Sequence, residues 1–136
     1  PNPVTDQEEH TFTYALYPHA ENWRAAGTVK EAYKLNQPLL TELCAGDGKE
    51  SFSFASVNVG SVVLETVKRA EDGNGTVLRM YESENALTKA KVTVDADFTK
   101  AYVCNLLEET ESEAQVNGKE VSVTLKPYEV VTLKLM

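Results

Sequence analysis

The sequence has few cysteines, few histidines and no long apolar run. Its 136 residues include 2 Cys, 2 His and 1 Trp. A small domain held together by disulfides needs several cysteine pairs, so two cysteines favour a reducing compartment, and we expect the cytoplasm. No apolar run approaches the roughly 18 residues that a membrane-spanning helix needs, so we expect no membrane partner.

Basic residues are also in the minority. The chain has 13 Lys and Arg against 21 Asp and Glu, a formal net charge of −8. A surface with this balance repels phosphate backbones and anionic lipids, so we expect no nucleic-acid partner. The length is that of one domain, with at most a short element attached. Because the sequence begins with Pro1 rather than Met, we expect it to be part of a longer gene product.

The motifs of common catalytic sites are missing as well. No GxSxG, GxGxxG or phosphate-loop pattern occurs. A metal site would have to combine His10 and His19 with Glu8 or Glu9, and structural roles are the more frequent ones for such residues. His19, for example, follows a proline at a corner where it can bond a backbone group. The sequence therefore predicts no catalytic, cofactor-binding or metal-ligating residue in this chain.

Alternating apolar and polar residues dominate what is present. Residues 90–98 and 120–125 alternate without exception, and residues 131–135 continue the pattern after a proline. Such alternation indicates strands with one buried and one solvated face. Closely spaced strands with turns between them predict an all-β fold, an antiparallel β-sandwich with one short helix near the N-terminus. Further predicted strands are residues 52–59, 62–68, 76–82 and 101–107. Residues 10–17 are predicted to be a lone strand whose partners would be strands earlier in the longer protein.

Two turns support this fold. Residues 71–75 (EDGNG) and Asn117-Gly118 each separate two β-rich runs and supply residues that tolerate positive φ. The first also resembles the opening of a calcium loop, but later oxygen ligands are missing, so a hairpin is the better interpretation. The acidic run at residues 108–113 is interpreted as a solvated face. Cys104 lies in an apolar run and is predicted to be a small core residue.

One segment has helical spacing instead. Residues 21–34 carry apolar side chains three to four positions apart, and Pro38 is expected to end the helix. We favour one helix that tolerates Gly27 in its interior. The alternative is a capping box of Thr28 and Glu31, with the helix starting only there. Trp23 falls on the apolar stripe and is predicted to pack in the core.

Several stretches, taken in order, resemble the C-terminal part of α-mannosidases of glycoside hydrolase family 38. The resemblance spans nearly the whole chain, and the ordered set is more specific than any one motif. The segments that carry it are HTFTYALYPH (residues 10–19), Trp23-Arg24, Glu31-Ala32-Tyr33, Asn36-Gln37-Pro38-Leu39, VVLETVKRAEDG (62–73), VLRMYE (77–82) with Asn85, and KPYEVVTLK (126–134).

The resemblance implies an accessory role. Residues 1–36 would be a strand and connecting helix, the tail of a preceding large β-sandwich, and residues 37–136 a small C-terminal β-sandwich domain. This non-catalytic domain would pack against and stabilise the catalytic and central domains of the same polypeptide. That longer polypeptide, here called the parent, would hydrolyse α-mannosidic bonds of mannose-containing glycans with retention, using zinc held outside this chain. The chain alone is expected to be inactive.

Two other hypotheses remain open at this stage. One is a carbohydrate-binding accessory module without hydrolytic activity, which predicts an exposed aromatic cluster. The other is a structural or interaction sandwich unrelated to sugars. The resemblance also allows an oligomer formed through the parent. Composition alone does not separate these hypotheses.

Overall fold

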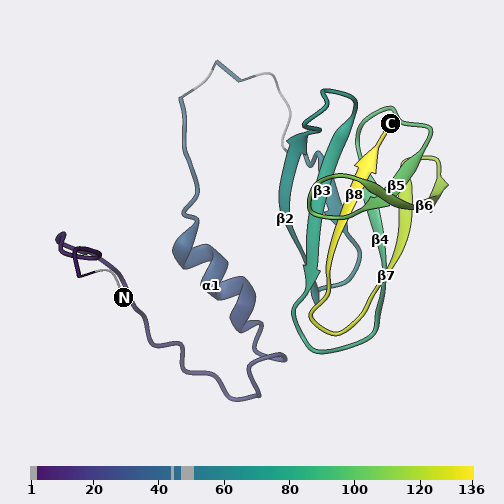
Figure 1. Cartoon of the computed structure of the whole chain (residues 1–136). Coiled ribbons are helices and arrows are strands. Elements are labelled where there is room, and N and C mark those ends of the chain that lie inside the picture. Colours follow the sequence, from purple (N-terminus) through teal and green to yellow (C-terminus); the bar gives the residue numbers. More distant parts are fainter. Residues whose placement is uncertain (1–2, 44, 47–50) are drawn as a thin grey trace. The chain divides into compact units, whose positions relative to one another are not determined.

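The computed structural model describes residues 3–43, 45–46 and 51–136. The chain divides into two compact units, Pro1–Thr41 and Glu42–Met136. The first unit contains the single helix and the second contains all the strands (Figure 1). Each unit is considered by itself below.

The described part of the N-terminal unit contains no strand, so residues 10–17, predicted as a lone strand with its partners elsewhere in the longer protein, do not form one in this chain. Phe12, Tyr14 and Leu16, which the alternation placed on one strand face, are 80%, 84% and 94% exposed. A strand requires a second strand to satisfy its ladder hydrogen bonds, and none is supplied here. The alternating pattern is real, but its partner is not among the described residues.

The helix, α1 (Thr28–Asn36), is shorter than predicted and begins where the alternative placed its start, but the capping box of Thr28 and Glu31 is not formed, since no side chain caps the helix. Gly27 precedes it as the N-cap with φ 66°, a left-handed conformation that interrupts any helix running through this position. The preceding residues form turns, in which the Asn22 side chain accepts two backbone N–H bonds. The helix ends two residues before Pro38, as predicted.

Trp23 is not a core residue, which corrects the sequence prediction. It lies in the turns before α1 rather than on the helix, so it does not share the helical stripe. Its side chain is 38% exposed, and the Arg24 guanidinium lies over the indole ring at 5.0 Å from the centroid. No residue of α1 is buried either.

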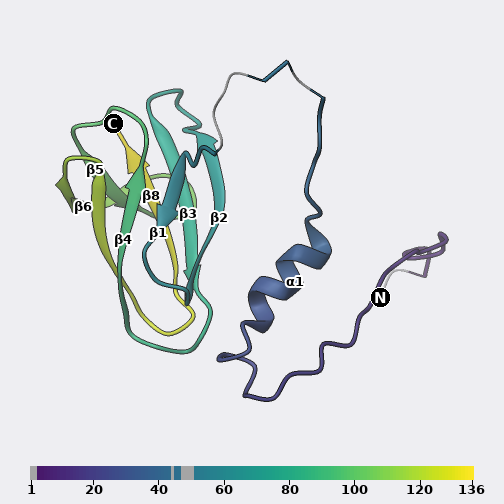
Figure 2. The same cartoon turned by 180° about the vertical axis from the view of Figure 1, so that it is seen from behind.

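The second unit is the all-β antiparallel fold that the alternation predicted. Every pair of neighbouring strands is antiparallel, and the strand order is β1-β4-β7-β6-β5-β8-β3-β2. The strands form two layers, and β6 joins them by pairing with β5 in one and β7 in the other (Figures 1 and 2). The strands are β1 (Ala55–Val57), β2 (Val62–Arg69), β3 (Thr76–Glu82), β4 (Thr88–Val94), β5 (Ala101–Cys104), β6 (Thr110–Asn117), β7 (Glu120–Leu125) and β8 (Val130–Leu135).

The core lies between the two layers. Its side chains come from alternate positions of the strands, as the period of two requires. In β4 and β7 the inward residues are buried and the outward ones exposed. Core residues with no exposed surface include Leu78, Met80, Val92, Val94, Val121, Leu125 and Leu133.

Both predicted hairpins are present. β2 and β3 are joined through residues 70–75, and β6 and β7 through Gly118 and Lys119. Gly75 has φ 99°, and a Cβ at this position would lie 2.0 Å from the carbonyl oxygen of Leu135. Glycine is therefore required where the hairpin meets the end of β8.

Candidate functional site

The histidines do not form a metal site with their neighbours. No group of three or more His, Cys, Asp or Glu that could hold a metal ion occurs in the described part of the chain. His19 donates from Nδ1 to the carbonyl oxygen of Glu21, and its ring lies 5.6 Å from that of Tyr17. The structural role predicted for His19 is therefore confirmed. His10 is exposed.

Cys104 is a buried free thiol, 5% exposed, as the sequence predicted. Burial raises its pKa, so the thiol stays protonated and is a poor nucleophile. Cys104 lies at the end of β5, opposite Thr132 in the register of the β5–β8 pair. Cys44, the other cysteine, lies outside the described residues.

Glu82, at the end of β3, is a fully buried carboxylate that the sequence reasoning missed. Its Oε1 accepts the N–H of Glu84 at 2.8 Å, and its Oε2 accepts those of Ala86 and Tyr128 at 3.1 Å each. Burial acts to raise its pKa, but the backbone N–H groups together outweigh burial and hold the pKa below its ordinary value. One ionised side chain thus joins the β3–β4 loop to the β7–β8 loop.

A second polar cluster is built around the β5–β6 connection, residues 105–109, which we call the strap. Asn105 shapes it: the side-chain carbonyl accepts the N–H groups of Leu107 (2.9 Å) and Glu109 (3.1 Å). The Asn105 amide also donates to the Glu109 carboxylate at 2.7 Å. The strap crosses in front of β8 and β3 in Figure 1.

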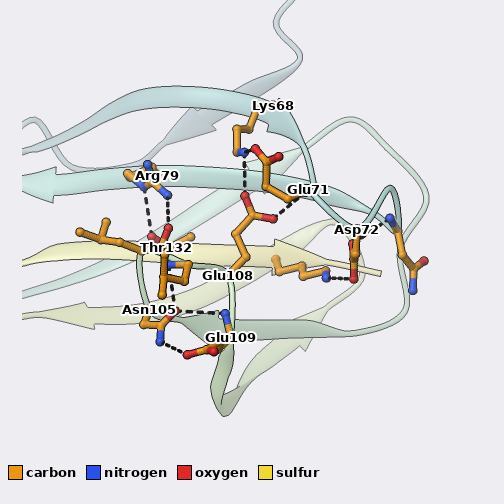
Figure 3. Close-up of polar contacts among 12 residues, drawn as sticks. Lys68, Glu71, Asp72, Arg79, Asn105, Glu108, Glu109 and Thr132 are labelled. Atoms are coloured by element: carbon orange, nitrogen blue, oxygen red, sulfur yellow. Dashed lines mark hydrogen bonds and ion pairs between the residues drawn. The ribbon is translucent and has the colours of Figure 1, made fainter.

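Side chains of the sheet and the strap hold the two together (Figure 3). Arg79 of β3 donates to Thr132 Oγ1 of β8 at 3.2 Å and to the carbonyl oxygen of Leu106 at 3.4 Å. At the other end of the strap, the Glu108 carboxylate accepts the backbone N–H of Glu71 at 2.8 Å. These bonds attach the strap to β3 and to the β2–β3 hairpin.

Glu108 is also the centre of an ion-pair group. It lies 2.7 Å from Lys68 Nζ, which pairs with Glu71 as well. The hydrogen bond from Lys68 lowers the pKa of Glu108, and the bond to Glu108, followed by that to Glu71, raises the pKa of Lys68. The acidic run is therefore not wholly a solvated face: the Glu108 side chain is 6% exposed. The sequence pattern missed this because Lys68 is 40 positions away and only the fold brings it close.

Lys134 and Asp72 form the last pair of the cluster. Lys134 Nζ lies 2.6 Å from Asp72 Oδ2, and the Lys134 side chain is 9% exposed. Asp72 also accepts the N–H of Asn74 at 2.9 Å, and the Lys134 bond, the stronger influence, lowers its pKa. The Asp72 oxygens thus accept hydrogen bonds from the hairpin and from Lys134, as expected of a turn rather than a calcium loop.

Two surface hollows are lined wholly by residues that the structure describes. One, of about 460 Å³, lies on the outward face of β4 and β7 and is lined by polar side chains that include Lys89, Lys91 and Thr124. The other, of about 450 Å³, is lined by Phe98, Lys119 and Met136 among others. Phe98 is the one aromatic side chain in these two linings. Neither hollow matches the cluster of exposed aromatic rings that the carbohydrate-binding hypothesis predicts.

The polar groups of the two clusters join loops to strands and to one another. In both clusters the described carboxylates accept hydrogen bonds from backbone N–H groups, from lysines or from the Asn105 side-chain amide. No helix among the described residues is long and apolar enough to span a membrane.

Comparison with known proteins points to one family. The family model described as "Glycosyl hydrolases family 38 C-terminal beta sandwich domain" matches residues 61–133. The chain is 33% identical to "Alpha-mannosidase 2C1" of Homo sapiens and 32% identical to that of Mus musculus. It is 29% identical to "Alpha-mannosidase G" of Dictyostelium discoideum. Each alignment covers 100% of the chain but only 13–14% of the relative, so the chain spans about one seventh of their length.

Proposed function

Because the chain belongs to the glycosyl hydrolase family 38 C-terminal β-sandwich domains, we propose that it is the non-catalytic C-terminal domain of an α-mannosidase. The family match carries this proposal, since it extends from the residue before β2 into β8 and so spans most of the sandwich. The relatives named as α-mannosidases support it. In the parent, other domains would hydrolyse α-mannosidic bonds in mannose-containing glycans, and this domain would stabilise them by packing.

The resemblance implies a zinc ion in the parent, and the residues of this chain do not fit it. His10 and His19 are the chain's two histidines, and His19 already donates to a backbone carbonyl. The described residues also bring no three metal-ligating side chains together. We therefore place the zinc in the catalytic part of the parent and derive no step through it here.

Residues 1–36 are proposed to belong with the preceding part of the parent, and residues 37–136 to form the small terminal sandwich. The support comes from Phe12, Tyr14 and Leu16, which alternate along an unpaired segment and are at least 80% exposed. An apolar row of this kind is stable when it faces a second sheet layer. The parent would supply that layer.

The location and assembly of the parent follow from the same proposal. The unpaired, buried thiol of Cys104 fits a reducing compartment, and we propose the cytoplasm. A mannose-containing glycan would be the partner of the parent's catalytic part, and any oligomer would form through the parent.

The proposal is tested by hydrolysis of a chromogenic aryl α-mannoside with zinc present. Three proteins are compared: the parent, the parent that ends before the position of Pro1 and so lacks this chain, and this chain alone. We expect turnover by the parent, less activity or a lower melting temperature in the truncated form, and none by the chain. Turnover by the chain alone, or an unaltered truncated parent, would contradict the proposal. Calorimetric titration of the chain with mannose oligosaccharides tests the carbohydrate-binding alternative, and we expect no heat of binding.

A further inference from the structure

The outward face of β2, β3 and β8 consists of three rows of side chains. Paired residues in an antiparallel ladder lie on the same face, and alternate residues along a strand share that face. The register of β2 with β3, which shifts between Leu64 and Thr66, and the register of β3 with β8 therefore fix which residues are neighbours. The rows are Lys68–Val77–Lys134, Thr66–Arg79–Thr132 and Val63–Tyr81–Val130.

The strap covers the first two rows. Glu108 reaches Lys68 in the first row, and the Leu106 carbonyl accepts from Arg79 in the second. As a result Val77 has no exposed surface and Thr132 only 2%, although both point away from the core. On this face the chain itself provides a third layer.

The third row, Val63–Tyr81–Val130, remains outside this cover, and we call it the open row. Val130 is 54% exposed, and Val63 and Tyr81 are half-buried. All three side chains are apolar or aromatic. An exposed apolar residue with half-buried neighbours, next to two covered rows, is a position at which a further protein surface can pack.

The loop that leads into the open row is held rigid. Tyr128, two residues before Val130, is 58% exposed and has φ 57°, a strained conformation for a residue with a side chain. Glu82 holds it there by accepting the Tyr128 N–H. An exposed tyrosine with a fixed backbone loses little entropy on binding, which makes it a favourable contact residue.

The chain covers only 13–14% of the length of its relatives, so a large polypeptide is available to cover this face. We propose that the open row, together with Tyr128, is the surface on which the preceding part of the parent packs. This inference rests on the proposed function. Because the row is apolar or aromatic, the complementary surface of the parent is apolar at its centre.

The test measures how fast a cysteine at the open row reacts with a maleimide. Val130→Cys is prepared in this chain and in the full-length parent, and modification is quantified on the peptide that contains position 130. The matched control is Thr124→Cys, because threonine has the shape of valine and Thr124 is exposed on the outward face of β7. We expect Val130→Cys to react at least tenfold more slowly in the parent than in the chain, and Thr124→Cys to react at similar rates in both.

Two results would overturn the inference. Equal rates for Val130→Cys in chain and parent would show that the parent leaves the row open. A rate in the isolated chain that falls with protein concentration, while Thr124→Cys is unaffected, would assign the row to a second copy. The assay is independent of the proposed activity: a parent that hydrolyses α-mannosides but leaves position 130 reactive refutes only the interface. An inactive parent with a protected position 130 refutes only the activity.

Discussion

Glu82→Gln should destabilise the chain far more than an ordinary glutamate substitution. Glutamine keeps one oxygen, and if that oxygen takes the place of Oε2 it still accepts from Ala86 and Tyr128. The new amide group then faces the N–H of Glu84, which is left as a buried donor without an acceptor. An orphaned buried donor costs about 1–3 kcal/mol, and turning two charge-assisted bonds into neutral ones costs roughly 0.5–1 kcal/mol each. We therefore expect the free energy of unfolding to fall by about 2–5 kcal/mol.

Urea unfolding followed by circular dichroism measures this loss as a lower midpoint with an unchanged slope. The control is Glu113→Gln on the exposed side of β6, which should change the free energy of unfolding by less than about 0.5 kcal/mol. Equal midpoints for the two variants would refute the role assigned to Glu82.

The pH dependence gives a second check on Glu82. Its pKa is lowered in the folded state, so the ionised form stabilises the fold above the ordinary value of 4.5. That stabilisation is lost as the pH falls through the lowered pKa. The difference between wild type and Glu82→Gln should therefore be constant near neutral pH and shrink in acid. A difference that grows on acidification would mean that Glu82 is protonated in the folded protein.

Three further perturbations test the strap, the hairpin and the core. Glu108→Gln should lower the melting temperature and speed amide exchange at Glu71, whose N–H loses its charged acceptor. Because the pKa of Glu108 is lowered in the folded chain, the difference from wild type should fade in acid. Unchanged amide exchange at Glu71 would contradict the contact between the strap and the hairpin. Gly75→Ala should cost more than about 2 kcal/mol in urea unfolding, since φ is 99° and the new Cβ meets a carbonyl oxygen; a neutral result would mean that the hairpin can shift. Leu133→Ala, at a core position with no exposed surface, should cost about 2–5 kcal/mol by the same assay, and a loss below about 1 kcal/mol would show a loosely packed core.

The sandwich could be predicted from the sequence because its strands and hairpins are marked by patterns within short segments. Alternation in residues 90–98 and 120–125 identifies strands directly, and the 71–75 and Asn117-Gly118 turns mark the hairpins between them. Register is then constrained, since a slip of one residue would expose the buried face. The resemblance to family 38 rests on the same ordered segments.

The predictions that failed depend on interactions outside their own segment. Residues 10–17 alternate like a strand, but a ladder needs a partner, and the described chain does not supply one. Gly27 in the left-handed region moves the helix start to Thr28 and leaves Trp23 in a turn. Glu82 and Glu108 look like any other glutamates in the sequence, since their donors are far away or belong to the backbone. The spacing of apolar and polar residues in the sequence does not indicate contacts of this kind.

The distribution of polar and apolar groups along β8 explains why a partner surface is expected on this domain. On its outward face the polar residues are the buried ones: Lys134 is 7% and Thr132 is 2% exposed, while the apolar Val130 is 54% exposed. A strand that faced water along its whole length would show the opposite order, since exposing apolar area costs roughly 25 cal/mol per Å². The strap accounts for the buried end, because it pairs or bonds the groups that it covers. By the same reasoning, the exposed apolar end of β8 is where we propose that the parent polypeptide packs.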